Sequence, residues 1–322
     1  MAAATIQQRV DAVLARDLRA SARLITQAES NEPEIRPVLQ ALYRHGGHAR
    51  VIGITGPPGA GKSTLVDQLV GLYRKRGQSV AVLAVDPSSP LTGGAVLGDR
   101  LRMSRHDTDS GVFIRSMATR GVLGGLSKAV GDALTVLDAM GWDVIIVETV
   151  GIGQSEMDIV RHTSCIVLLQ TALSGDVVQI AKAGILEVGD IFVVNKSDVA
   201  GSERMVNALN EMIGNRADHG APGKWQHGVV QTDALSGKGV AELGDQIERR
   251  FAFLAEHPAA AKAQQVVQLR KRALEIAKDI VHRRIDEQLE NDQTLDQQIG
   301  EVLLRESDPY AFAQGLLGRS LS

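Results

Sequence analysis

Residues 51–64 of this chain read Val-Ile-Gly-Ile-Thr-Gly-Pro-Pro-Gly-Ala-Gly-Lys-Ser-Thr. The apolar run at 51–55 predicts a strand buried on both faces, and a helix-like stretch at 64–76 follows the glycines at once. Between them, residues 56–63 fit the pattern G-x-x-x-x-G-K-[ST], which is specific in a strand–loop–helix context. We therefore predict a phosphate-binding loop here, rather than a glycine-rich turn that happens to contain a lysine.

The predicted loop offers several kinds of group to a phosphate. Gly56 and Gly61 let the backbone curl so that its N–H groups point at phosphate oxygens, and the helix N-terminus adds partial positive charge. The Lys62 ammonium can reach the β- and γ-phosphates, and the Ser63 hydroxyl can ligate Mg²⁺. The nucleotide-binding residues predicted in this loop are Gly56, Pro57, Pro58, Gly59, Ala60, Gly61, Lys62, Ser63 and Thr64.

The composition is that of an ordinary globular protein. The 322 residues are 44% hydrophobic and 23% charged, and the net charge of −3 gives no reason to expect binding to nucleic acid or to an anionic membrane. The single cysteine, Cys165, excludes an internal disulfide and lies in an apolar run. We see no secretory signal and no apolar run long enough to span a bilayer, so we expect a cytoplasmic protein.

The pattern along the chain predicts three regions. Apolar residues at helical spacing over 5–44, with breaks expected at Pro33 and Pro37, predict an N-terminal helical extension, residues 1–47. Strands and helices then alternate through 48–256, which predicts an α/β domain with a mostly parallel sheet and helices on both faces. Residues 257–322 read as a C-terminal helical arm with a break near Asp308-Pro309. Its apolar stripe packs either on the sheet domain or, as we favour, on a second copy as a dimerisation segment.

Polar residues close several of the predicted strands. The strands after the first are predicted at 79–85, 112–115, 143–148, 164–170, 190–195 and 228–232, with helices near 121–140, 176–188, 202–213 and 239–255. Asp86, Glu148 and Asn195 each end or directly follow a strand. Since ligands of such sheets gather beyond the carboxyl ends of the strands, these residues are candidates for the site.

The tetrapeptide Asn195-Lys196-Ser197-Asp198 predicts the base. The Asp198 carboxylate can accept from the ring N1–H and the exocyclic amine of guanine, a donor pair that adenine lacks. Asn195 and Lys196 would brace this loop. Ala234 and Leu235, in a later turn, are the expected backbone contacts to the base, although Asp233 stands where serine would be more usual. We therefore predict a guanine nucleotide, GTP or GDP.

Four residues are candidate magnesium ligands: Ser63, Asp86, Asp99 and Glu148. They are more than Mg²⁺ needs at once, so one or two can instead cap helices or pair with arginines. Gly151, three residues after Glu148, is the expected amide contact to the γ-phosphate. Ile152 follows it where many GTPases carry a water-orienting glutamine, and Gln154 is the nearest substitute. We therefore expect GTP hydrolysis to be slow without help from a partner.

Together these motifs resemble the MeaB/ArgK family of P-loop GTPases. The resemblance rests on the segments 56–64, 85–90, 98–103, 148–156 and 195–198, and it extends over most of the chain. It implies a homodimeric GTPase that gates adenosylcobalamin loading into an acyl-CoA mutase and protects that mutase from inactivation. The mutase would be methylmalonyl-CoA mutase or a close relative, and adenosylcobalamin would be met only through this partner.

The resemblance also bears on the segment 175–182. From spacing alone, Gln179 and Lys182 would be an ordinary exposed helix face. The resemblance instead implies a segment that couples the nucleotide to the mutase, with Lys182 or Gln179 moving toward the phosphates when a partner docks. Val177, Val178 and Ala181 depart from the more acidic, lysine-rich version usual in the family, which leaves the identity of the mutase open.

Two other functions compete with this prediction. A nickel or cobalt metallochaperone GTPase would need a delivery site, whereas the eight histidines here are scattered and have no cysteine partner. A small-molecule kinase built on the same loop would transfer phosphate to an acceptor and would show no preference for guanine.

Overall fold

The computed structural model describes residues 5–86, 104–106, 108–118, 125–149, 151, 162–172, 188–216, 220–291 and 294–321. The chain divides into two compact units, Met1–Gln268 and Leu269–Ser322. The first unit contains the predicted strand–loop–helix segment.

The first unit is built on one seven-stranded sheet, in which all the paired strands are parallel and the order is β3-β2-β4-β1-β5-β6-β7. This confirms the predicted α/β class. The strands are β1 (Arg50–Thr55), β2 (Val80–Asp86), β3 (Val112–Ala118), β4 (Val144–Thr149), β5 (Cys165–Gln170), β6 (Ile191–Val194) and β7 (Gly228–Gln231). β1, which leads into the glycine-rich loop, lies between β4 and β5, so its carboxyl end is flanked by strand ends on both sides.

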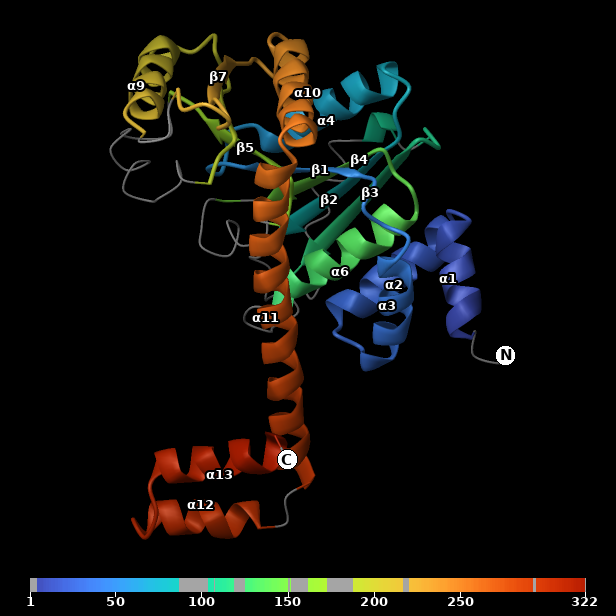
Figure 1. Cartoon of the computed structure of the whole chain (residues 1–322), viewed down its shortest axis with the longest axis vertical. Coiled ribbons are helices and arrows are strands. Elements are labelled where there is room, and N and C mark those ends of the chain that lie inside the picture. The colour runs from blue at the N-terminus through green and yellow to red at the C-terminus, as the bar shows by residue number, and fades with distance from the viewer. Residues whose placement is uncertain are drawn as a thin grey trace. The chain divides into compact units, whose positions relative to one another are not determined.

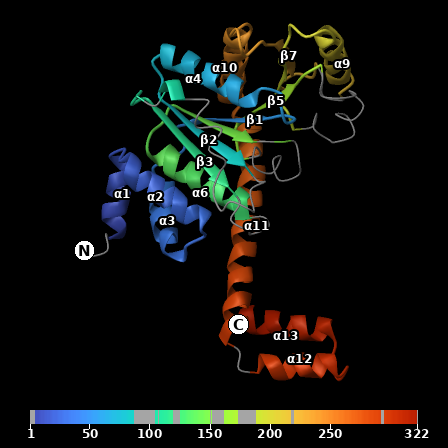
Figure 2. The ribbon, with the colours of Figure 1, turned by 180° about the vertical axis from the view of Figure 1, so that it is seen from behind.

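Helices cover both faces of the sheet, as Figure 1 and the reverse view in Figure 2 show. On one face, Ile52 and Ile54 of β1 pack in a core with α4 (Lys62–Lys75) and α10 (Val240–Glu256). On the other, Ile145 and Val147 of β4 pack in a core with α6 (Gly125–Ala139) and the N-terminal helices. Alternate strand residues point to opposite faces, and both faces are covered, so β1, β4 and β5 are apolar almost throughout. A third cluster joins β6 to α9 (Ser202–Gly214).

The N-terminal extension is not one helix interrupted at Pro33 and Pro37. It contains α1 (Ile6–Leu14), α2 (Leu18–Glu29), the 3-10 turn η1 (Pro33–Ile35) and α3 (Arg36–Tyr43). The chain breaks first at Arg16, where φ is +60°, and Asp17 then caps α2 by accepting from the amides of Arg19 and Ala20. Pro37 breaks nothing because it lies in the first turn of α3, where a missing N–H removes no helical hydrogen bond.

The second unit is helical. It contains the later part of α11 (Pro258–Asn291), then α12 (Leu295–Leu303) and α13 (Pro309–Leu321). Asp308 caps α13 by accepting from the amides of Tyr310 and Ala311, which confirms the predicted break; the break between α11 and α12 was not predicted. Among the described residues, no helix combines the length and the apolar content that crossing a bilayer requires.

Candidate nucleotide-binding site

The glycine-rich loop has backbone angles that glycine alone adopts readily. Gly61, the residue before α4, has φ of +90°, and Gly59 has φ of +74°. Gly56 is required for a different reason, since a Cβ there would lie 2.7 Å from the carbonyl oxygen of Leu169. The loop is therefore a tight turn at the carboxyl end of β1 that leads directly into a helix N-terminus, as the sequence predicts.

The Lys62 ammonium is folded back onto this loop. Its Nζ donates to the carbonyl oxygens of Gly56, at 2.8 Å, and Pro57, at 3.0 Å, and the residue is only 6% exposed. A buried ammonium at a helix N-terminus is strongly attracted to an anion, since little water screens the interaction. The Lys62 ammonium, the predicted phosphate ligand, therefore lies against the glycine-rich loop.

Asn195 joins the two halves of the predicted site. Its Nδ2 donates to the carbonyl oxygen of Ala60 at 2.7 Å. This bond joins residues 195–198, called the base loop here, to the glycine-rich loop. Its Oδ1 accepts from the Thr232 hydroxyl at 2.9 Å and from the Ala234 amide at 3.1 Å. The side chain is buried, at 1% exposed, so three hydrogen bonds hold three loops together in a place with little access for water.

The remaining base-loop residues lie at the surface beside Asn195. Lys196 adopts φ of +57°, Asp198 is exposed, and Leu235 is 86% exposed while its neighbour Ala234 is buried. The amide of Ser197 donates to the carbonyl of Thr232, so the two loops run side by side. This leaves the Asp198 carboxylate and the Leu235 backbone accessible to a base, which is what their predicted roles require.

Asp233, the departure from the expected serine, stabilises its own turn. Its carboxylate accepts from the Ser236 hydroxyl and from the amide of Leu235. The hydrogen bond from Ser236 is the main reason that the pKa of Asp233 is lowered. The aspartate therefore supplies a turn-capping oxygen much as a serine would.

The two described candidates for metal ligation meet directly. The Ser63 hydroxyl donates to Glu148 Oε1 at 2.6 Å, and the residues are 8% and 4% exposed. Hard oxygen donors of this kind suit Mg²⁺, so Ser63 and Glu148 fit that ion. Asp86 ends β2, and its side chain lies outside the described part of the structure.

Asp99, Gln154, Gln179 and Lys182 lie outside the described residues. Gly151 is described, and its carbonyl oxygen accepts from the Thr55 hydroxyl at 2.9 Å. Within the described ranges, no group of three or more His, Cys, Asp or Glu side chains could hold a metal ion.

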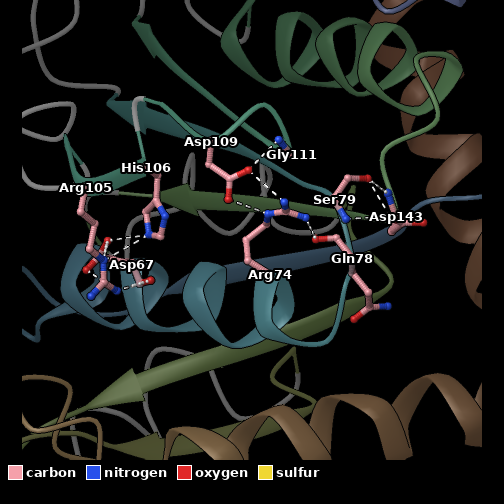
Figure 3. A network of polar contacts seen from close by, with 9 residues as sticks. All are labelled: Asp67, Arg74, Gln78, Ser79, Arg105, His106, Asp109, Gly111 and Asp143. Carbon is pink, nitrogen blue, oxygen red and sulfur yellow. Dashed lines mark hydrogen bonds and ion pairs between the residues drawn. The ribbon is translucent and has the colours of Figure 1, made fainter.

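Sequence motifs missed a polar network that holds α4 in place (Figure 3). Near the start of α4, the Asp67 carboxylate accepts from Arg105 at 2.8 Å and pairs with His106 at 3.1 Å. Near its end, Arg74 donates twice to Asp109, at 2.8 and 2.9 Å. The paired hydrogen bonds between the Arg74 guanidinium and the Asp109 carboxylate are strongly directional, and all these contacts anchor α4 to the segment that precedes β3.

A buried ion pair lies at the start of β6, away from the strand ends that carry the loops. Asp190 accepts from Arg250 at 3.0 Å and from the amide of Ile166 at 2.8 Å. Burial raises the pKa of the Asp190 carboxyl to about 6, and the charge of Arg250 offsets only part of that rise. This pair is structural, since it joins α10 to the sheet.

Comparison with known proteins identifies the family. The family model described as "Methylmalonyl Co-A mutase-associated GTPase MeaB" matches residues 21–292. This chain belongs to the MeaB family. A relative from Pyrococcus abyssi is 45% identical over 301 residues, which cover 94% of this chain and 92% of the relative. The Escherichia coli protein named GTPase ArgK is 37% identical over 257 residues, covering 77% and 75% of the two chains.

A solved structure supports the same assignment. The crystal structure of a protein described as a LAO/AO transport system kinase has a TM-score of 0.68 and 25% sequence identity, and the match covers 100% of this chain and 99% of that one. Members of the MeaB family are GTPases, so the loop, the base motif and the Ser63–Glu148 pair belong to a GTP-binding and GTP-hydrolysing protein. This confirms the predicted family and enzyme class.

Proposed function

We propose that this MeaB-family GTPase is the chaperone of an adenosylcobalamin-dependent acyl-CoA mutase, either methylmalonyl-CoA mutase or a close relative. It would gate loading of adenosylcobalamin and protect the mutase from inactivation. The observation that carries this proposal is the match over residues 21–292 to a family described by its association with methylmalonyl-CoA mutase.

In this proposal the phosphates of GTP lie on residues 56–64, with the Lys62 ammonium leaving Gly56 and Pro57 to meet the β- and γ-phosphates. Asp198 reads the guanine edge, Lys196 lies along the base, and the backbone of Ala234 and Leu235 closes over it. Asn195 holds the two loops together through its contact with Ala60. These roles follow from the sequence motifs, and the burial and hydrogen bonding of Lys62 and Asn195 support them.

The hydrolytic step forms a bond from water to the γ-phosphorus and breaks the bond from that phosphorus to the β–γ bridging oxygen, releasing phosphate and GDP. Mg²⁺, when bound, neutralises charge on the β- and γ-phosphate oxygens. Ser63 and Glu148 would hold it, with Asp86 and Asp99 as further candidates. Lys62 stabilises the charge that develops on the leaving oxygen, and the Gly151 amide orients the γ-phosphate.

Hydrolysis by the protein alone is expected to be slow, because Ile152 stands where a water-orienting glutamine is usual. Gln154, Gln179 and Lys182 are the residues proposed to supply the missing groups once the mutase docks. The mutase would therefore raise the GTPase rate.

Mixing experiments test the chaperone role. The full chain is combined with purified methylmalonyl-CoA mutase, and both the GTP hydrolysis rate and the release of adenosylcobalamin from the mutase are followed. We expect faster hydrolysis and slower cofactor loss with wild type, and neither effect with Lys62→Ala. Unchanged rates with this mutase and with its isobutyryl-CoA and hydroxyisobutyryl-CoA relatives would contradict the proposal.

We further propose that the protein is a homodimer joined through the second unit. Large apolar side chains are exposed on its helices, including Leu303 at 78%, Leu304 at 72% and Tyr310 at 83%. Only Leu316 is a buried hydrophobic residue among those described in this unit. Exposed apolar side chains of this size are stabilised by burial, and a second copy of the chain would supply a matching set.

Sedimentation of the full chain tests the dimer. We expect wild type to sediment as a dimer at micromolar concentration and the double variant Leu303→Glu/Leu304→Glu to sediment as a monomer. The control is Gln297→Glu, which adds a charge to α12 at an exposed position that is already polar. A monomeric wild type would contradict this part of the proposal and leave the GTPase assignment untouched.

A further inference from the structure

The ends of β1 and β4 carry two threonines side by side. The two strands pair in parallel with Ile54 opposite Glu148, so the next residues, Thr55 and Thr149, stand opposite each other. Both are fully buried, at 0% exposed. The Thr149 hydroxyl donates to the Thr55 hydroxyl at 2.9 Å, and the Thr55 hydroxyl donates to the carbonyl oxygen of Gly151 at 2.9 Å.

These contacts lie on the opposite face of the sheet from the Ser63–Glu148 pair. Glu148 shares a face with Ile146, which packs with α4, whereas Thr149 shares a face with Val147, which packs with α6. The end of β4 is thus held on both sides, by Ser63 through Glu148 on one and by Thr55 through Thr149 on the other.

The hydrogen-bonded chain leads from the phosphate loop to Gly151. Thr55 directly precedes Gly56, whose carbonyl oxygen accepts from the Lys62 ammonium at 2.8 Å. Gly151 is the second residue after Thr149, and its carbonyl is also 3.4 Å from the Thr149 hydroxyl. Glycine has no side chain to hold it by packing, so hydrogen bonds to its backbone must set its position.

We propose that Thr55 and Thr149 are positioning residues for GTP hydrolysis, which act by holding the Gly151 peptide against the phosphate loop. The Thr55 hydroxyl donates to the Gly151 carbonyl oxygen. Thr149 orients the Thr55 hydroxyl, because the Thr149 hydroxyl donates its proton to one lone pair of the Thr55 oxygen. Consecutive hydroxyl donors polarise one another, so the second threonine strengthens the bond that the first one makes. The proposal rests on the GTPase activity of the family and not on the mutase.

A purely structural role for the two threonines makes a different prediction. Valine has nearly the same shape as threonine and is favoured in strands, so Thr55→Val keeps the packing and removes only the hydroxyl. Serine keeps the hydroxyl and removes a methyl group. If packing alone matters, Thr55→Ser is the more damaging change; if the hydroxyl positions Gly151, Thr55→Val is.

Steady-state GTP hydrolysis by the full chain tests the proposal. We expect Thr55→Val to lower kcat about tenfold, with KM for GTP and Kd for GDP within about twofold of wild type, and Thr55→Ser to stay within about threefold in kcat. Thr149→Val should lower kcat less than Thr55→Val does. The double valine variant should be no slower than Thr55→Val, because Thr149 acts through Thr55.

Equal kcat values for Thr55→Val and Thr55→Ser would overturn the proposal, as would a loss of GDP affinity as large as the loss of kcat. Thermal unfolding is measured for every variant. If Thr55→Val does not fold, Thr149→Val and Thr149→Ser decide by the same kcat comparison, and equal values for those two overturn it. Hydrolysis by wild type in the same assay separates this outcome from a failure of the GTPase assignment.

Discussion

Replacing Asn195 by aspartate removes the amide donor and adds a negative charge at a buried site, while the shape of the side chain stays the same. In wild type, Nδ2 donates to the Ala60 carbonyl at 2.7 Å, while Oδ1 accepts from Thr232 and Ala234. An aspartate keeps both accepted bonds but turns an oxygen toward the Ala60 carbonyl. Since the site is 1% exposed, no water replaces the lost donor easily.

The size of the effect follows from these contacts. A buried carbonyl left without its donor costs about 1–3 kcal/mol, and the oxygen that now faces it adds repulsion. A nucleotide needs the phosphate loop and the base loop in place together, so this cost falls on binding as well as on folding. Since about 1.4 kcal/mol is a factor of ten in affinity, Asn195→Asp should weaken GDP binding by about ten- to a hundredfold.

Titration calorimetry with GDP and urea unfolding measure the two effects separately. The matched control is Thr232→Val, which removes one donor to the same Oδ1 and leaves the Ala60 contact intact. We expect this loss to weaken binding by about 0.5–1.5 kcal/mol, which is a few-fold in affinity for GDP. A Kd for GDP within twofold of wild type for Asn195→Asp, at an unchanged urea midpoint, would refute the bridging role.

Three further predictions concern other parts of the first unit. Gly61→Ala should abolish GTP and GDP binding in calorimetry, because φ is +90° and the new Cβ would lie 2.5 Å from Asn195 Nδ2; Gly77→Ala, also at positive φ but with open space around it, is the control. Glu148→Gln should lower Mg²⁺-dependent GTP hydrolysis on the order of a hundredfold while GDP binding without Mg²⁺ changes little, and equal losses in both would contradict the metal role. Asp190 binds its proton more tightly in the folded state, where its pKa is about 6, than in the unfolded chain, where it is 3.8. Its contribution to the free energy of unfolding is therefore largest at low pH and falls by roughly 3 kcal/mol as pH rises from about 4 to about 6. Urea unfolding should therefore show a smaller fall over this range for Asp190→Asn, and an identical fall would contradict it.

Local patterns in the sequence were enough for the sheet and for the phosphate loop. The central strands β4, β5 and β6 are apolar runs, because both faces of the sheet are covered there and nearly every residue of these strands is buried. The edge strand β3 is different, since it carries Arg115 and Ser116 and is only partly buried. The loop could be predicted because Gly56 and Gly61 meet steric demands that are local. The helix break at Arg16 was missed because no glycine or proline marks it.

Only the tertiary structure revealed the contacts that organise the site. Asn195 and Ala60 are 135 residues apart, and Thr55 and Gly151 are 96 apart. Strand order and register bring them together, and neither can be read from spacing along one segment. The sequence by itself predicted which residues meet a nucleotide, because that chemistry resides in short motifs. The fold decided which buried side chains hold those motifs in position, because a hydrogen bond between distant segments exists only once the sheet has placed both partners.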